Sequence, residues 1–301
     1  MDIRNNVCIV TGSAQGLGKA FVKILLDNGA KVCISDLNEE KSQSTVEEFE
    51  NKYGKESVCF VKCDVTKEEE FDALFDKTEA HFKVNCIDLL VNNAGINTNF
   101  GWKKCMEVNI MAVMTGTDIA LRRMKKASKK GSIVNTASMA GIVTGMGEEM
   151  IGYSVSKHGV VALTRTLAKD YSHHGVSIKA LCPAWADTEI VSSAVDSAND
   201  KDKKNLNKSI KQQGGLMTPE YVAEGFYNLV TKCDNGSVMW SLKGVPYLVI
   251  PDDSEFKVIL RVIMAKLIGK MTGNDLITVF QQKIFFLGFL VLMIILCNWF
   301  F

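Results

Sequence analysis

The sequence predicts an α/β protein built on one doubly wound parallel sheet with helices on both faces. Three observations predict this class. Short apolar runs, such as "VCIVT" at 7–11 and "KVCISD" at 31–36, alternate with segments of helical period over residues 1–250. The run at 7–11 is continuously apolar up to its last residue, which is typical of parallel strands that are covered on both faces. Small or polar residues follow directly after most runs, at the edge where such sheets bind ligands.

Length and composition fit one large domain at 1–250 with an appendage after it. The chain has 301 residues, of which 47% are hydrophobic, and a net charge of +1. A charge so close to zero gives no reason to expect a nucleic-acid partner. The nine cysteines include no C-x₂-C pair. We therefore expect reduced thiols that pack as small hydrophobes, and no metal site.

The first strand, at 7–11, runs into the glycine-rich turn "TGSAQGLG" and then into an amphipathic helix. Glycines let the backbone turn tightly and approach a pyrophosphate, which then sits on the free N–H groups of the helix start. The flanking strand and helix are the context that the motif requires. The turn therefore predicts a Rossmann-type dinucleotide site. Its expected lining residues are Gly12, Ser13, Gln15, Gly16, Leu17 and Gly18.

Asp36 ends the second strand, at 31–36. A carboxylate there accepts hydrogen bonds from an adenosine ribose and repels a 2′-phosphate. Leu37 and Asn38 follow it, so no arginine is placed to receive that phosphate, and Gln15 in the glycine turn is also uncharged. The pattern favours NAD over NADP as the cofactor. The alternative for Asp36 is an ordinary turn residue at a strand end.

The next two strands end in further candidate residues. Charged-face helices at 38–53 and 67–82 alternate with strands at 57–65 and 87–95. The first of these strands ends in Cys63, Asp64 and Val65, and the last two are placed to contact an adenine. The second strand ends in "NNAG", where Asn93 and Gly95 are small enough for a ligand to approach. An Asn-rich turn without a ligand is the alternative.

A long helical segment at 102–126 contains Asn109. Asparagine is a poor residue for a helix interior. We expect its side-chain amide to distort the helix and to bind a water molecule there.

Tyr153-x-x-x-Lys157 opens the helix at 153–171, and Ser138 ends the preceding strand at 131–138. The four-residue spacing puts both side chains on one helical face. An ammonium beside a phenol would lower the pKa of Tyr153 from ~10 toward neutrality and make it an acid/base for an alcohol or carbonyl. Ser138 would bond the reacting oxygen. The alternative is an exposed helix with a snorkelling lysine.

The rest of the domain continues the alternation. We expect strands at 176–184 and 237–242 and a capped helix at 218–233. The segment at 190–215 is rich in Ser, Asn and Lys and has no clear period. Its position predicts a substrate lid, and its composition is equally compatible with a solvated loop.

Together these motifs resemble the short-chain dehydrogenase/reductase family over about residues 1–250. Each motif is weak alone, but the set and its order are specific. The motifs are Thr11-Gly-x-x-x-Gly16-x-Gly18, Asp64, Asn92-Asn93-Ala94-Gly95, Asn109, Ser138 and Tyr153-x-x-x-Lys157. One departure is Pro183-Ala184, where the family has Pro-Gly.

The resemblance implies that Tyr153 is the acid/base, Ser138 polarises the substrate oxygen and Asn109 holds a relay water. Lys157 would lower the pKa of Tyr153 and bind the nicotinamide ribose. The turn after strand 176–184 would reach the nicotinamide end through Pro183, Ala186, Asp187 and Thr188.

The implied reaction is NAD-dependent oxidation of a secondary hydroxyl to a ketone on a small, apolar, lipid-like substrate such as a prostaglandin. A steroid, retinoid or general alcohol dehydrogenase is the alternative, and an idle NAD-binding module is a second. The resemblance also implies a homodimer through the helices at 102–126 and 153–171.

The composition changes after residue 251. Apolar residues at helical spacing with basic residues off their stripe predict an amphipathic linker at 252–283, which would lie on a membrane or pack on the core. Residues 284–301 are 18 residues without a charge. As a helix they would extend ~27 Å, close to the ~30 Å hydrocarbon core of a bilayer.

We expect this tail to anchor the protein in a membrane, and a buried terminal or dimer helix is the alternative. The N-terminus has no signal-peptide pattern. The catalytic domain would then face the cytosol, with the endoplasmic reticulum as the expected membrane, and would otherwise be cytoplasmic.

Overall fold

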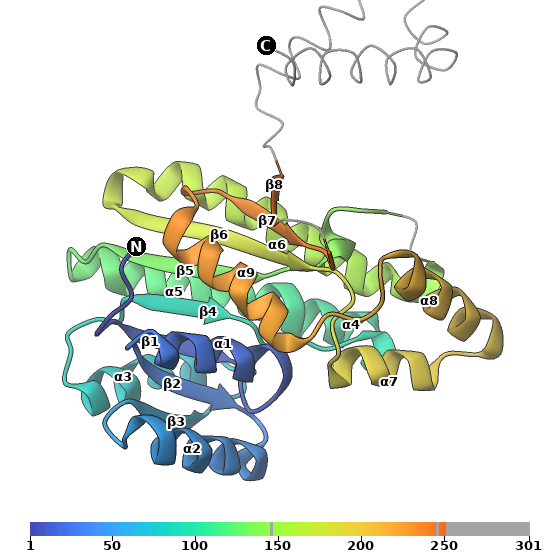
Figure 1. Cartoon of the computed structure of the whole chain (residues 1–301). Coiled ribbons are helices and arrows are strands. Elements are labelled where there is room, and N and C mark those ends of the chain that lie inside the picture. The colour runs from blue at the N-terminus through green and yellow to red at the C-terminus, as the bar shows by residue number, and fades with distance from the viewer. Residues whose placement is uncertain (145–146, 245–246, 251–301) are drawn as a thin grey trace, which may run out of the picture. The chain divides into compact units, whose positions relative to one another are not determined.

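An eight-stranded sheet runs through the protein in the order β3-β2-β1-β4-β5-β6-β7-β8 (Figure 1). The computed structural model describes residues 1–144, 147–244 and 247–250. Every neighbouring pair of strands is parallel except β7 and β8. The strands are β1 Val7–Thr11, β2 Lys31–Asp36, β3 Val58–Lys62, β4 Leu89–Asn92, β5 Gly131–Thr136, β6 Val176–Pro183, β7 Val238–Ser241 and β8 Leu248–Ile250. The doubly wound parallel sheet predicted from the sequence is confirmed, and only the short antiparallel β8 was not expected.

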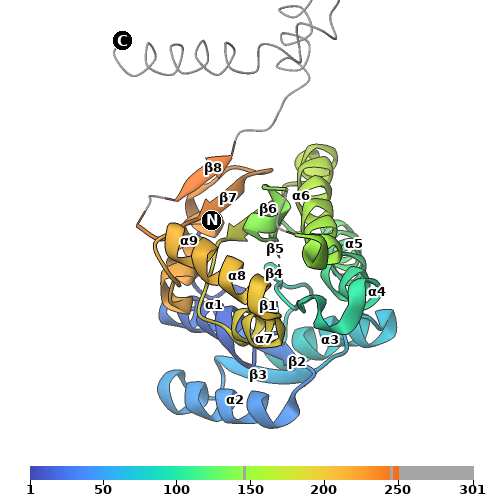
Figure 2. The ribbon, with the colours of Figure 1, turned by 90° about the vertical axis from the view of Figure 1, so that its right-hand side faces the viewer.

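Helices cover both faces of the sheet (Figure 2). One layer contains α1 Gly16–Asp27, α2 Glu39–Tyr53 and α9 Pro219–Lys232, and the other contains α3 Glu68–Phe82, α5 Ala112–Lys126 and α6 Ile151–Tyr171. Phe21 of α1 stacks on Phe226 of α9 with ring centroids 4.4 Å apart. Shorter elements are α4 Gly101–Met106, α7 Glu189–Ser197, α8 Asp200–Gln212, a π-helical turn Glu107–Met111 and the 3₁₀ turns Thr98–Phe100, Met139–Gly141, Glu148–Met150 and Ser172–His174.

The strand order places a topological switch point between β1 and β4. The chain winds outward from β1 through β2 to β3, and then returns across the sheet to β4. The loops after β1 and β4 therefore diverge at the carboxyl edge and leave a crevice, which is where such sheets bind ligands. The fold thus provides one defined edge for a site.

The helix predicted at 102–126 is interrupted. It consists of α4, the π-helical turn and α5, and Asn109 lies in the turn. A π turn widens the helix by one residue and often marks a functional position. The helix is therefore distorted at Asn109, while the expectation that its amide binds a water stays a prediction.

The segment at 190–215 is two helices, not a loop. Residues Ile190, Val191 and Ala194 of α7 are spaced so that they share one face and line a recess. Helix α8 is polar, and Asn199 caps it by accepting a hydrogen bond from the Asp202 N–H group at 3.0 Å. Little of α8 is buried, so most of its residues are polar. Its helical period therefore could not be recognised in the sequence.

The expectations for 252–283 and 284–301 concern residues outside the described part of the chain. Within the described ranges, no helix combines the length and the apolar composition that crossing a bilayer requires.

Candidate active site

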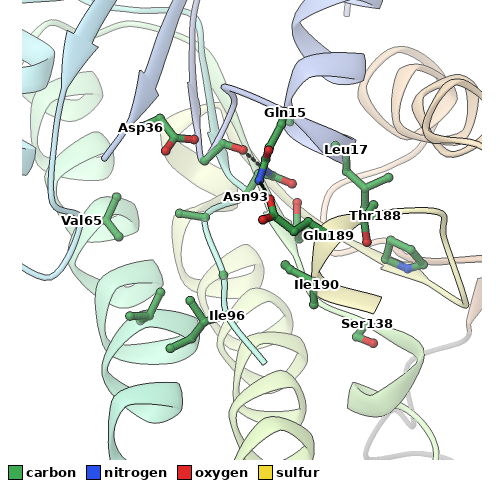
Figure 3. Close-up of a pocket in the computed structure, with 18 of the residues that line it drawn as sticks. Gln15, Leu17, Asp36, Val65, Asn93, Ile96, Ser138, Thr188, Glu189 and Ile190 are labelled. Carbon is green, nitrogen blue, oxygen red and sulfur yellow. Dashed lines mark hydrogen bonds between the residues drawn. The ribbon is translucent and has the colours of Figure 1, made fainter. Parts of the chain in front are cut away.

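A cleft of about 470 Å³ opens at the carboxyl edge of the sheet, beside the ends of β1 and β4. Figure 3 shows Asp36 and Val65 at one end of it and Ser138 at the other, with Asn93 between them. Residues from the ends of six strands and the starts of three helices meet here. A cleft that extends from Asp36 to Ser138 fits an extended dinucleotide with a reacting centre at one end.

The glycine turn forms a tight cradle in the cleft. A Cβ at Gly12, whose φ is +61°, would lie 2.7 Å from the Ala94 Cα atom, and a Cβ at Gly18 would lie 2.2 Å from the Gly12 carbonyl oxygen. Asn93 supports the turn, since its Nδ2 donates to the carbonyl oxygens of Thr11 and Gly12, both at 2.9 Å. Only glycine fits these positions, so the cradle fits a pyrophosphate that approaches the start of α1.

Asp36 lies at the opposite end of the cleft from Ser138. Its carboxylate accepts hydrogen bonds from the N–H groups of Ala14 at 3.1 Å and Asn38 at 3.0 Å, which fix it at the end of β2. Beside it, burial acts to raise the pKa of Asp64, but hydrogen bonds from Thr66 and nearby lysines outweigh that effect, so the pKa is lowered. Two carboxylates at this end suit a ribose and an adenine edge, and oppose a 2′-phosphate.

Tyr153, Lys157 and Ser138 meet at the other end. Tyr153 and Lys157 lie in the first two turns of α6, with the Lys157 Nζ 5.7 Å from the centre of the Tyr153 ring. Lys157 is 4% exposed, and its Nζ donates to the Thr136 carbonyl oxygen at 2.8 Å. The expected pairing of a phenol, a hydroxyl and an ammonium is therefore present.

The expected direction of the Tyr153 pKa is wrong for this structure. Burial raises the pKa of Tyr153 above its usual value, and its hydrogen bond with Ser138 lowers it by less. Burial also lowers the pKa of Lys157, to about 8. Removal of water from the site disfavours the charged form of both side chains, and this is the largest influence on each pKa.

Asn109 lies beneath the cleft and is fully buried. Its Oδ1 accepts from the Ile96 N–H group at 2.8 Å, and its Nδ2 donates to the Ile96 carbonyl oxygen at 2.9 Å and to the Cys105 Sγ at 3.1 Å. The amide thus fixes the loop that follows Gly95.

The structure brings most of the predicted residues to this cleft. Asn109, which lies beneath the cleft, and Ser13 and Asp187 are exceptions. The Ser13 hydroxyl points into the core and donates to the Val10 carbonyl oxygen at 2.6 Å, because the turn needs that bond to close. Asp187 lies in a neighbouring recess behind the glycine turn. The predicted residues that line the cleft are Gly12, Gln15, Gly16, Leu17, Gly18, Asp36, Leu37, Cys63, Asp64, Val65, Asn93, Gly95, Ser138, Tyr153, Lys157, Pro183, Ala186 and Thr188.

Sequence reasoning missed several lining residues. Some of them lie next to a motif and others lie in the segment between Gly95 and Asn109, where the local sequence does not show which side chain faces the cleft. Adjacency to Gly95 and Thr188 was the available signal for some of them. They are Ile96, Phe100, Lys104, Val108, Thr136, Ala137 and Glu189.

Comparison with known proteins points to one family. The family model described as short chain dehydrogenase matches residues 6–199. The chain is 32% identical to the 15-hydroxyprostaglandin dehydrogenases [NAD(+)] of Bos taurus, over 253 residues, and Homo sapiens, over 247 residues. Each alignment covers 79% of this chain and 91% of the relative. A 3beta-hydroxysteroid dehydrogenase 2 of Eggerthella lenta is 34% identical over 197 residues, which is 62% of this chain and 74% of that protein.

Among solved structures, levodione reductase superposes with a TM-score of 0.73 at 27% identity and covers 80% of this chain and 98% of its own. The stretches "VKCDV", "LLVNNAGIN" and "ALCPAWADT" already indicate a likeness to the 15-hydroxyprostaglandin dehydrogenases, and the comparison confirms it. The glycine cradle, the carboxylate of Asp36 and the Ser138–Tyr153–Lys157 group agree with these matches. The chain therefore belongs to the short-chain dehydrogenase family and is an NAD-dependent oxidoreductase that acts on CH–OH groups.

Proposed function

We propose that the protein oxidises a secondary hydroxyl to a ketone on an apolar, lipid-like substrate, as the name of its 15-hydroxyprostaglandin dehydrogenase relatives suggests. The observation that carries this proposal is an apolar recess of about 60 Å³ beside Ser138 and Tyr153. The one amide that lines it, on Asn97, is already engaged by the Ile190 carbonyl oxygen and the Ser193 hydroxyl. The apolar residues around it are Met139, Ala140, Met150, Pro183, Ala184, Trp185, Ile190, Val191 and Ala194.

Four residues would perform the reaction. Tyr153 takes the proton of the substrate hydroxyl, and Ser138 holds the reacting oxygen by a hydrogen bond. Lys157 would anchor the cofactor ribose, and Asn109, which fixes the loop at Ile96, would hold the relay water. NAD, held by the glycine cradle and Asp36, supplies the hydride acceptor.

A substrate panel tests this proposal. We expect the full chain to form NADH with prostaglandin E2 more efficiently than with a 3β-hydroxysteroid or a simple secondary alcohol, because 15-hydroxyprostaglandin dehydrogenases match this chain over 79% of its length. NADH absorbance gives kcat/KM for each. A preference for the steroid would favour a second candidate function, a hydroxysteroid dehydrogenase. The 34% identity to a 3beta-hydroxysteroid dehydrogenase supports that candidate. No turnover with any of them, while NADH still binds, would favour an idle binding module.

We also propose that residues 284–301 anchor the protein in a membrane. The support is their composition, which is 18 residues without a charge behind Lys283 and with Trp299 near the end. Deleting 284–301 should move the protein from the membrane pellet to the supernatant after cell fractionation. A chain that lacks only the last three residues is the control. If the chain without 284–301 stays in the membrane pellet, as the control does, the anchor is contradicted.

A homodimer is supported by exposed apolar side chains on the 3₁₀ turn Thr98–Phe100, on α4, on the π-helical turn after α4 and on α6. Phe100, Trp102, Met111, Ile151 and Val155 are between 52% and 67% exposed. A second copy would bury this surface. Light scattering of the full chain in detergent should give twice the protein mass of one 33.2 kDa chain. Val155→Asp should give single chains, and an unchanged mass would exclude this face.

A further inference from the structure

Three polar side chains from distant parts of the chain meet at the mouth of the cofactor cleft. Gln15 precedes α1, Lys41 lies in the first turn of α2, and Glu189 is the first residue of α7. The Gln15 Nε2 donates to the Glu189 Oε2, as Figure 3 shows. The Lys41 Nζ donates to the Gln15 Oε1 at 2.7 Å and lies 3.2 Å from the Glu189 Oε2. We call these three residues the polar bridge.

The polar bridge spans the part of the cleft that receives the pyrophosphate. Gln15 and Glu189 both line the cleft beside Gly16. A Cβ at Gly16 would lie 3.6 Å from the Thr188 Cγ2, so the start of α7 rests directly against the glycine turn. Helix α7 also lines the apolar recess. One helix start therefore borders both the cofactor and the substrate ends of the site.

The charge of Glu189 opposes the ligand at this place. A free helix start attracts anions, and the pyrophosphate brings two negative charges to the start of α1. Hydrogen bonds from Gln15 and Lys41 hold the pKa of Glu189 below its usual range, so its carboxylate is charged at neutral pH. Lys41 neutralises that carboxylate in this structure. A bound dinucleotide would compete with Glu189 for the same ammonium.

We propose that Glu189 and Lys41 set the affinity for the dinucleotide with opposite signs. The polar bridge holds the start of α7 against the glycine turn, and cofactor entry requires it to open. Opening releases the Lys41 ammonium from Glu189 and makes it available to the anionic cofactor. The carboxylate of Glu189 thus weakens cofactor binding and speeds cofactor release, and Lys41 strengthens binding.

Equilibrium titration of the full chain with NADH, followed by nicotinamide fluorescence, tests the proposal without any substrate. Glu189→Gln keeps the shape of the side chain and removes its charge, and should lower the Kd for NADH about fivefold to tenfold. Lys41→Met should raise it by about the same factor. Glu39→Gln is the matched control, since it removes the same charge from an exposed ion pair with Lys62 at 3.0 Å, outside the cleft lining.

The Kd for NADH at high salt distinguishes an effect of the charges in the polar bridge from an effect of side-chain shape. Because the groups are exposed, the difference between the wild type and Glu189→Gln should shrink at 1 M salt, where the Debye length is about 3 Å. An unchanged or higher Kd for Glu189→Gln at low salt would overturn the proposal. Equal tightening by Glu39→Gln would also overturn it, because net charge would then be the cause.

Discussion

Tyr153→Phe should lower kcat for alcohol oxidation by about 10²–10⁴-fold and leave NADH binding nearly unchanged. The phenolic oxygen is the group of the site that can take the hydroxyl proton. It is hydrogen-bonded with Ser138, which lies at the opposite end of the cleft from Asp36 (Figure 3). Phenylalanine keeps the ring against Lys157, so packing is preserved. Steady-state kinetics and NADH titration of the same preparation separate the two effects.

The pH profile gives a second signature of the same residue. Because burial raises the pKa of Tyr153, the reactive phenolate is scarce at neutral pH. The wild-type oxidation rate should therefore rise with pH into the alkaline range, whereas carbonyl reduction, which needs the protonated phenol, should fall. Tyr171→Phe, at the other end of α6, is the control and should keep the wild-type rate and profile. Substantial turnover by Tyr153→Phe would refute the proposed acid/base.

Lys157→Met should abolish most turnover and at the same time stabilise the fold. The Lys157 ammonium is 4% exposed, and the partner of its Nζ is a carbonyl oxygen, with no carboxylate paired to it among the described residues. Its pKa is lowered from 10.5 to about 8, which corresponds to a cost of about 3 kcal/mol for the buried charge. Methionine fills the same space without that cost.

The stability of the wild type should depend on pH, because the pKa of Lys157 falls from 10.5 in the unfolded chain to about 8 in the folded protein. Between pH 8 and 10.5 the unfolded chain holds a proton on Lys157 that the folded chain has lost, so wild-type stability rises with pH in that window. The advantage of Lys157→Met should therefore be largest below pH 8 and vanish above 10.5. Thermal unfolding at pH 7 should show a Tm higher by roughly 5–10 °C for a gain of this size.

Lys179→Met is the matched control for this variant. Lys179 is also 4% exposed, donates to a carbonyl oxygen, that of Val230 at 3.0 Å, and has a pKa lowered by burial. It lies under α9, away from the cleft. Its replacement should change stability and leave kcat/KM unchanged. Lys157→Met with normal turnover, or with a lower Tm at pH 7, would contradict the account of Lys157.

Much of the site follows from local sequence. β1 and β2 begin and end at the predicted residues because a strand buried on both faces must be apolar along its length. The glycine turn is readable because a Cβ at Gly12 or Gly18 would collide with backbone. The spacing of Tyr153 and Lys157 is readable because four residues make about one helical turn.

The sequence could not give side-chain direction or solvation. Ser13 stands among glycines that line the cleft, yet its hydroxyl bonds inside the turn. The period of α7 and α8 was hidden because their polar faces remain in solvent. These features depend on contacts with residues far along the chain, which no local pattern contains.

The sequence by itself determined the parallel sheet and the edge that binds ligands, since both follow from burial period and turn chemistry. The turn chemistry at Asp36 also favoured NAD, and the resemblance to the family indicated the four residues that we place in the reaction. Only the tertiary structure decided that Asn109 fixes Ile96, that the Lys157 ammonium is buried against Thr136, and that Glu189 meets Gln15 and Lys41. The physical reason is that desolvation and charge pairing depend on which distant elements pack together.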